Sequence, residues 1–219
     1  MPWLWAFGGS VFDESGACVL DNQACIDTLA WYQKLAEAGY IKANMSRFDA
    51  RQLYAMGKVG FYDDAIMARS ICASNGVAEA DLDKTILPML RPVLKEGDAP
   101  TSTMWGHLLV VFKNSSDKAS SADFVKYLVS KDVSLDYFAE CNVLPVMTEA
   151  LADEAVVSDA WASAWSEISA TGRENELKFF ANSNELSTII SEELQAVVIG
   201  EKTPEDAAKS MKTRVDNAM

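Results

Sequence analysis

The stretch Trp105–Lys131, WGHLLVVFKNSSDKASSADFVKYLVSK, decides the fold. Its first part reads WGHLLVVF and is apolar almost without interruption, which is typical of a strand buried on both faces of a helix-covered sheet. Its second part has apolar side chains at helical spacing and predicts an amphipathic helix with Phe124, Tyr127 and Leu128 facing inward. A buried strand that leads directly into a helix indicates an α/β protein.

The rest of the chain continues this alternation of helices with short strands. A hairpin is expected over residues 11–22, and further strands are expected in KVGFYDD, residues 58–64, and TILPML, residues 85–90. Helices with recognisable capping residues or stop signals are expected over residues 23–39, 46–58, 65–76, 132–142, 148–170, 184–200 and 202–219. The sequence therefore predicts an α/β fold that is rich in helices and has only short strands.

Composition and charge exclude several classes of protein. Of the 219 residues, 49% are hydrophobic and 23% are charged, which is usual for a globular protein and unusual for a disordered one. The net charge of −13 opposes binding to nucleic acid or to an anionic membrane surface, because both require clusters of Lys and Arg. The longest apolar runs have the length of a strand, so no membrane-spanning helix is expected.

No catalytic or metal-binding motif is visible. The four cysteines lack CxxC or zinc-type spacing, so we expect buried or idle thiols, with a disulfide between Cys18 and Cys25 as an open alternative. His107 is the one histidine, and the sequence contains no GxSxG elbow, phosphate-binding loop or HExxH. We therefore expect no enzyme activity, no metal and no cofactor. An enzyme would need His107 within hydrogen-bond reach of a Ser, Cys or carboxylate.

Several strings, in their order along the chain, resemble one known family. They are WAFGGSVFDESG, MGKVGFYDD, the stretch Trp105–Lys131, NVLP, and IGEKTPEDAAKSMKTRVDNA. On these strings the chain resembles the extracellular solute-binding proteins of ABC importers, in the sugar-binding branch that includes maltose-binding protein. One element departs from the family pattern, since DDAIM follows the strand where Gly-Pro-Trp is usual, which puts a ligand contact there in doubt.

The resemblance implies a periplasmic-binding-protein-like fold with two lobes, of which this chain corresponds to the C-terminal portion, truncated at the N-terminus. Residues 1–104 are expected to begin the second lobe, residues 105–145 to belong to the first lobe, and residues 146–219 to return to the second. The implied function is capture of a mono- or oligosaccharide in a cleft between the lobes and delivery to a membrane permease. The implied protein is monomeric and periplasmic or extracellular, with a membrane anchor in its full-length form.

A sugar ring has apolar C–H faces that aromatic side chains cover, and hydroxyl groups that polar side chains bind. The candidate ligand-binding residues are Trp3, Trp5, Asp64, Met67, Trp105, His107, Asn182, Asn184 and Glu185. Each also has a structural interpretation: a tryptophan can fill a core, Asp64 can be a solvated strand end, and the Asn residues can cap a helix. Trp161 and Trp165 lie four residues apart on one helical face and are expected to pack rather than bind.

Two other non-enzymatic functions remain open beside the sugar. An acidic cleft in the same fold suits a polyamine, and an exposed apolar patch at residues 2–7 suits an interaction protein without a small ligand. A chain that lacks much of one lobe is expected to bind its ligand weakly, because half a cleft provides only part of the contacts.

Overall fold

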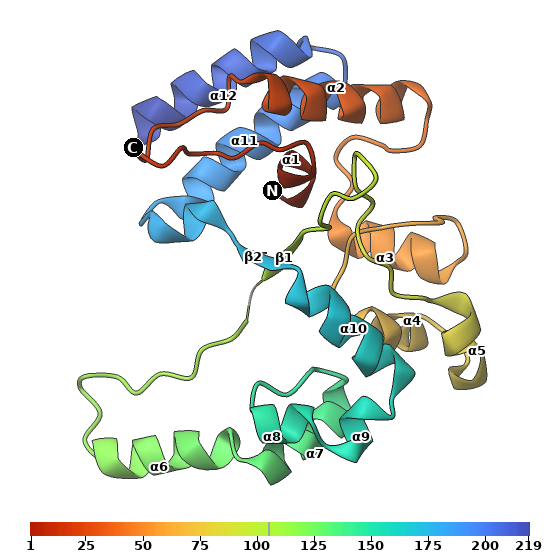
Figure 1. The fold of residues 1–219 in the computed structure, drawn as a ribbon, viewed down its shortest axis with the longest axis vertical. Coiled ribbons are helices and arrows are strands. Elements are labelled where there is room, and N and C mark those ends of the chain that lie inside the picture. Colours follow the sequence, from red (N-terminus) through yellow and green to blue (C-terminus); the bar gives the residue numbers. More distant parts are fainter. Residues whose placement is uncertain (105) are drawn as a thin grey trace. The chain divides into compact units, whose positions relative to one another are not determined.

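Figure 1 shows a computed structural model that describes residues 1–104 and 106–219. Its elements, in chain order, are α1 (Pro2–Ala6), α2 (Gln23–Glu37), α3 (Arg47–Ala55), α4 (Ala68–Ser74), α5 (Glu79–Thr85), β1 (Ser102–Met104), α6 (Lys118–Leu128), α7 (Lys131–Cys141), α8 (Thr148–Leu151), α9 (Glu154–Val157), α10 (Ala160–Ala170), β2 (Gly172–Glu174), the 3-10 helix η1 (Glu176–Phe179), α11 (Ser183–Val198) and α12 (Pro204–Ala218). The expected α/β fold, rich in helices with short strands, is confirmed. No helix within the described ranges has both the length and the apolar character that crossing a membrane requires.

The chain divides into two compact units, which we describe separately. Unit 1 consists of Met1–Met45, Leu90–Trp105 and Thr171–Met219, and unit 2 consists of Ser46–Met89 and Gly106–Ala170. These boundaries differ from the expected lobe boundaries, because residues 46–89 and 146–170 fall in the same unit as residues 106–145. The assignment of residues 1–104, 105–145 and 146–219 to lobes of a binding protein stays a prediction.

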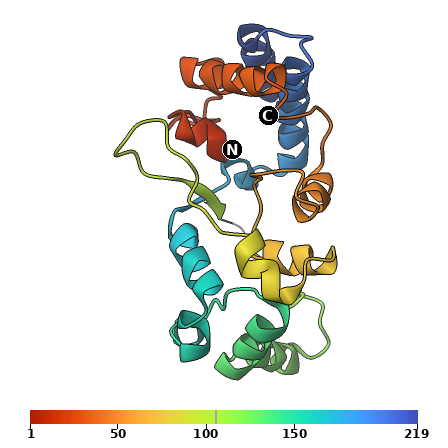
Figure 2. The ribbon, with the colours of Figure 1, turned by 90° about the vertical axis from the view of Figure 1, so that its right-hand side faces the viewer.

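Three long helices, α2, α11 and α12, pack against one another in unit 1 (Figures 1 and 2). The side chains between them are fully buried and aliphatic, among them Leu20, Leu186, Val197, Met211 and Val215. Burying side chains of this size contributes roughly 1.5–3 kcal/mol each. This core is therefore the main source of stability in unit 1.

Helix ends follow the capping residues that the sequence contains. The Asn22 side chain accepts a hydrogen bond from the Cys25 N–H (3.0 Å) and begins α2. Ser46 and Asp49 form a reciprocal capping box at the start of α3, as their spacing predicts. The Thr203 hydroxyl accepts a backbone N–H in the first turn of α12. These interactions are local, so the sequence alone locates these helix starts.

Unit 1 contains two short backbone pairings, one between distant segments and one within a local hairpin. Strands β1 and β2 are parallel, with Ser102 opposite Gly172. The expected hairpin near the N-terminus is present as an antiparallel bridge between Phe12 and Cys18, and Asp13 closes its turn by accepting hydrogen bonds from the next residues. Arg173 of β2 lies over the ring of Trp5 in α1, and Glu176 links Trp5 to Phe12 of the hairpin, so both pairings are connected to α1.

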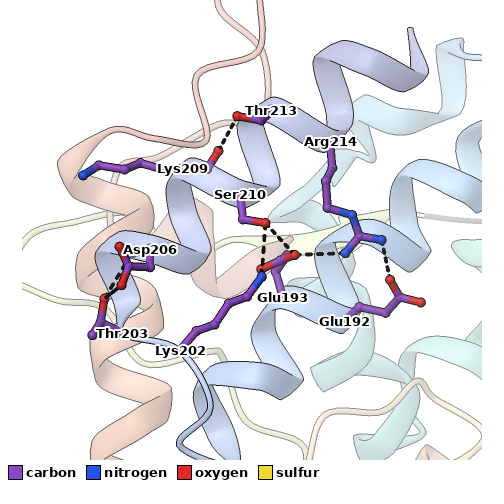
Figure 3. A network of polar contacts seen from close by, with 9 residues as sticks. All are labelled: Glu192, Glu193, Lys202, Thr203, Asp206, Lys209, Ser210, Thr213 and Arg214. Carbon is purple, nitrogen blue, oxygen red and sulfur yellow. Dashed lines mark hydrogen bonds and ion pairs between the residues drawn. The ribbon is translucent and has the colours of Figure 1, made fainter.

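A buried carboxylate joins α11 to α12 (Figure 3). The Glu193 side chain is 3% exposed and accepts hydrogen bonds from Lys202 Nζ (2.6 Å), Ser210 Oγ (2.8 Å) and Arg214 Nη1 (2.9 Å). Arg214 also donates to Glu192 Oε2 (2.5 Å) at the surface. Burial raises the pKa of the Glu193 carboxyl, but the hydrogen bonds from Lys202, Arg214 and Ser210 outweigh it, so this pKa lies below its ordinary value.

Unit 2 contains two smaller cores. One gathers Ala68, Cys72, Leu82, Ile86 and Trp161, and the other gathers Phe138, Val156 and Ala162. Trp161 donates its ring N–H to the carbonyl oxygen of Ile66 (3.0 Å), and its ring centroid lies 6.0 Å from that of Trp165. Both tryptophans pack against the first of these cores, as their spacing predicts.

Unit 2 also corrects the strand predictions. Residues 58–64, 86–90 and 106–112 form no strand, although the sequence predicts a strand in each of the three stretches. Leu108–Phe112, predicted to be buried on both faces, are exposed. A strand is stable only when its N–H and C=O groups pair with a neighbouring strand, and none of these stretches pairs with a described strand. An apolar run indicates that a segment is suited to burial. It becomes a strand only when another segment pairs with its backbone.

The orientation predicted for α6 is also wrong. Phe124 and Tyr127 are predicted to face inward but are largely exposed, and α6 has no fully buried residue. The spacing of its apolar side chains defines one face of the helix, as predicted. That face lacks a covering layer within the described part of unit 2, which is the reason for the difference.

The Glu193 network predicts a pH-dependent loss of stability. Because the folded-state pKa of Glu193 is lowered, its contribution is fully present above the unfolded-state pKa, near 4.5, and is lost as the pH falls through the folded-state pKa. Glu193→Gln is expected to cost about 1–3 kcal/mol at neutral pH, less than for a fully buried pair because both cations are more than one-third exposed. Urea unfolding at pH 7 and at pH 3 measures the difference, which should shrink in acid.

The matched control is Glu192→Gln, which removes a neighbouring carboxylate that pairs with the same Arg214 but is more than half exposed. It is expected to cost less than about 1 kcal/mol. Equal costs for the two variants, or a Glu193→Gln penalty that does not change between pH 7 and pH 3, would contradict the role assigned to the network.

The burial of each cysteine predicts which thiols react in the folded chain. All four are free, and Cys18, Cys25 and Cys72 are buried, whereas Cys141 is partly exposed. Burial raises the pKa of Cys25 to about 12 and also raises the pKa of Cys18 and of Cys72, so all three stay protonated and unreactive at pH 8. Ellman's reagent is expected to label Cys141 in the folded chain and four thiols in urea.

Cys141→Ser serves as the control and should remove the signal of the folded chain while three thiols remain in urea. Only two reactive thiols in the unfolded wild-type chain would instead show that one disulfide has formed, as the sequence leaves open for Cys18 and Cys25.

Candidate functional site

A cluster of aromatic side chains lies at the surface of unit 1. Trp3, from α1, packs against Trp31, from α2, with ring centroids 4.5 Å apart. Phe7 lies 6.1 Å from Trp31, and Tyr32 meets the same ring edge-on at 5.0 Å. All four rings are partly exposed, so they present aromatic surface to solvent. We call Trp3, Phe7, Trp31 and Tyr32 the aromatic cluster.

A guanidinium group is part of this cluster. Arg91 Cζ lies 4.9 Å from the centroid of the Trp3 ring, a cation–π contact worth roughly 0.5–2 kcal/mol depending on desolvation. Arg91 belongs to the segment that precedes β1 and is far from α1 in the sequence. The cluster therefore combines apolar ring surface with a fixed positive charge that has several N–H donors.

Trp5 lies in the interior instead and fixes α1. Its side chain is 4% exposed, and its ring N–H donates to Glu176 Oε1 (2.7 Å). Glu176 Oε2 accepts the backbone N–H groups of Val11 (2.7 Å) and Phe12 (3.2 Å), and Arg173 Cζ lies 4.7 Å from the Trp5 ring. With the ring covered, the structure favours the core interpretation of Trp5. Its effect on the site is to hold α1, and so Trp3, in position.

Asp64 also has a structural role. Its carboxylate receives two hydrogen bonds from Arg51, Nε to Oδ2 at 2.8 Å and Nη2 to Oδ1 at 2.6 Å. The pair is buried, and the hydrogen bonds that Arg51 donates to the Asp64 carboxylate raise the pKa of Arg51. Phe48 covers the guanidinium, with Cζ 5.5 Å from the ring centroid. Asp64 is therefore neither a solvated strand end nor an exposed ligand contact in this structure.

Three further candidates, Met67, Trp105 and His107, come from separate parts of the sequence. Met67 immediately precedes α4 and is partly exposed. His107 is exposed in the extended stretch after β1. Trp105 lies outside the residues that the structure describes. The structure thus places neither Met67 nor His107 in the aromatic cluster, which belongs to unit 1.

The three candidates around the start of α11 lie at one end of that helix. Asn182 donates to the carbonyl oxygen of Ala218 (2.8 Å) and to Glu185 Oε2 (3.3 Å), so it links the start of α11 to the end of α12. Its side chain makes no capping hydrogen bond. Asn184 and Glu185 are exposed in the first turn of α11. These polar groups are accessible, but none has an aromatic contact in the cluster.

Sequence reasoning did not identify Trp31, Tyr32 and Arg91 as site residues. Neither aromatic had a usable local signal, because Tyr32 lies three residues after Leu29 and Trp31 lies three residues after Thr28, so both are at helical spacing from buried positions of α2. Arg91 had no such signal either, since its contact with Trp3 arises from the tertiary fold. In residues 1–104 and 106–219, no three His, Cys, Asp or Glu side chains gather as metal ligands would.

Comparison with known proteins identifies relatives of about twice this length. A binding protein of Brucella abortus (strain 2308) is 20% identical over 97% of this chain, and the chain spans about half (51%) of that relative. Three solved structures are similar in fold. Maltose-bound MalE3 of T. maritima has a TM-score of 0.83 and 22% identity, with 100% of this chain and 56% of that chain covered.

The GacH receptor of Streptomyces glaucescens, solved unliganded and in complex with acarbose, has a TM-score of 0.84 and 20% identity over 99% of this chain and 55% of that chain. An ABC transporter solute-binding protein of Thermotoga lettingae bound to α-D-tagatose has a TM-score of 0.79 and 22% identity, with 99% and 55% covered. A family model described as bacterial extracellular solute-binding protein matches residues 1–165, three-quarters of the chain. The chain belongs to the bacterial extracellular solute-binding proteins.

Proposed function

We propose that this chain is part of the carbohydrate-binding subunit of an ABC importer, and that the aromatic cluster of unit 1 contributes to its sugar site. The observation that carries this proposal is a partly exposed group of four aromatic rings beside the guanidinium of Arg91. Aromatic surface covers the C–H faces of a sugar, and a charged donor binds its hydroxyl groups. Solved relatives in complex with maltose, acarbose and tagatose support the same class of ligand.

The full-length protein is proposed to capture its sugar in a cleft between two lobes and to deliver it to a membrane permease. Lobe closure needs no chemical step, because its free energy comes from contacts that only the closed, liganded state makes. We place the full-length protein outside the cytoplasmic membrane, because its family is described as extracellular. Anchoring to the membrane and the permease partner are part of the proposal.

A polyamine is the second candidate ligand, and the net charge of −13 is the observation that favours it. At the aromatic cluster, however, the positive charge of Arg91 opposes the binding of a polyamine. Arg91 lies on the Trp3 ring and would repel an ammonium group that approached the same surface. We therefore place the neutral sugar first at this site.

Ligand-observed NMR with the 219-residue chain tests the sugar site. Weak saturation transfer is expected to maltose or maltotriose and not to spermidine. Trp31→Ala is expected to weaken binding about two- to tenfold, which corresponds to the loss of one aromatic contact. Trp31 is the best position to change because it contacts three other aromatic side chains of the cluster.

Tyr40→Ala is the matched control, since Tyr40 is an exposed aromatic residue of unit 1 without a ring contact in the cluster. It should leave binding unchanged. Saccharide binding that is equal in the wild-type and Trp31→Ala chains would remove the cluster from the site. Binding of spermidine alone would replace the carbohydrate with the polyamine.

A further inference from the structure

Glu176 accepts three hydrogen bonds from the N-terminal part of unit 1. Its Oε1 atom accepts the ring N–H of Trp5 at 2.7 Å. Its Oε2 atom accepts the backbone N–H groups of Val11 at 2.7 Å and of Phe12 at 3.2 Å. The three donors are 164 to 171 positions away from Glu176 in the sequence, so the tertiary fold alone brings these groups together.

The chemistry of these partners requires a carboxylate at position 176. All three partners are N–H donors, and an ionised carboxylate has two acceptor oxygens and no donor. The amide of a glutamine has the same shape but only one oxygen, because an NH₂ group takes the place of the other. That NH₂ group would face either the Trp5 ring N–H or the two backbone N–H groups. At least one partly buried donor would then lose its acceptor.

The carboxylate is carried by a well-anchored element. Glu176 begins η1, and the Asn175 side chain caps this 3-10 helix by accepting the N–H of Leu177 at 3.0 Å. The Leu177 side chain is fully buried in the main core of unit 1. Phe180 follows η1 and packs on Phe12, with ring centroids 4.7 Å apart. The oxygens of Glu176 therefore have a defined position within unit 1.

Helix α1 needs a directional contact of this kind. It has five residues and no side-chain cap, so it is too short to be stable alone. Leu4 and Trp5 are buried and keep the helix on the core, but apolar burial has no preferred direction. The hydrogen bond from the Trp5 ring to Glu176 depends on angle as well as on distance. This bond therefore limits the rotation of α1 about its own axis.

The rotation of α1 sets the position of Trp3. Residues two apart in an α-helix point about 200° apart around the axis, so Trp3 points away from the core when Trp5 points into it. In that orientation the Trp3 ring lies 4.5 Å from the Trp31 ring, between centroids, and 4.9 Å from Arg91 Cζ. A turn of the helix would move both α1 tryptophans together and would separate Trp3 from Trp31.

We propose that Glu176 is a positioning residue of the sugar site, and that its carboxylate orients α1, and through α1 the Trp3 ring, without touching the ligand. This inference rests on the proposed function, because it takes the aromatic cluster as the place where the saccharide binds. It adds that affinity depends on a group outside the cluster. Glu176 and its three donors all belong to unit 1, and their hydrogen bonds are partly buried.

Titration of maltotriose into the 219-residue chain, followed by ligand-observed NMR, tests the effect on affinity. Glu176→Gln is expected to weaken binding about two- to tenfold, as the loss of one aromatic contact would. The matched control is Glu193→Gln, which removes another carboxylate with three donors from unit 1, between α11 and α12. It should lower stability in urea without changing the affinity.

Trp5→Phe is the second variant, and it keeps the proposal testable if Glu176→Gln does not fold. It removes the ring N–H that Glu176 Oε1 accepts but keeps an aromatic ring in the core. Binding of maltotriose should weaken in the same direction as in Glu176→Gln.

A double-mutant cycle separates positioning from a general loss of structure. If Glu176 acts through Trp3, Glu176→Gln should cost no further affinity in a Trp3→Ala background, because residues that act through one another have non-additive effects. A merely structural role would give two losses that add.

The chain without ligand provides an independent measurement. Two indole rings in contact, such as those of Trp3 and Trp31, give an exciton couplet in circular dichroism. Trp3→Phe identifies the part of the spectrum that belongs to this pair. Glu176→Gln should reduce the same part, and Glu193→Gln should leave it unchanged.

Three results would overturn the inference. They are a folded Glu176→Gln chain that binds maltotriose as the wild type does, a loss of affinity that adds fully to that of Trp3→Ala, and a couplet that Glu176→Gln leaves intact. Absence of saccharide binding by the wild-type chain would instead contradict the proposed function. The couplet would then decide by itself whether Glu176 orients Trp3.

Discussion

The carboxylate of Glu176 holds together parts of unit 1 that are far apart in the sequence. It accepts the ring N–H of Trp5 and the backbone N–H groups of Val11 and Phe12. Hydrogen bonds to a charged acceptor are stronger than those between neutral groups, and three donors share this one carboxylate. Loss of the carboxylate would leave partly buried donors without acceptors, at a cost of roughly 1–3 kcal/mol each.

This interaction determines where the aromatic cluster lies. Helix α1 is only five residues long, too short to be stable without tertiary contacts. Trp5 fixes the helix through Glu176, so Trp3, two residues earlier, is held against Trp31 and Arg91. Burial of Trp5 and partial exposure of Trp3 are thus two consequences of the same attachment.

The acidic excess of the chain does not extend to its buried sites. Inside the units, Arg51 pairs with Asp64, and Lys202 and Arg214 pair with Glu193, since a buried charge without a partner is costly. Arg91 and Arg173 lie against the rings of the two N-terminal tryptophans. These five basic side chains therefore take part in tertiary contacts, and the net charge of −13 is a poor guide to the potential at the aromatic cluster.

The sequence by itself determined most of the longer helices, because their signals are local, whereas the short helices α1 and α5 were not predicted. The caps at Asn22, Ser46 and Thr203 and the stops near Gly39 and Gly57 act within a few residues, so helix ends could be predicted closely. The tertiary structure alone decided which extended segments became strands, because a strand requires a partner from elsewhere in the chain. It also decided the site, since the contacts among Trp3, Trp31 and Arg91 join segments that no local pattern connects.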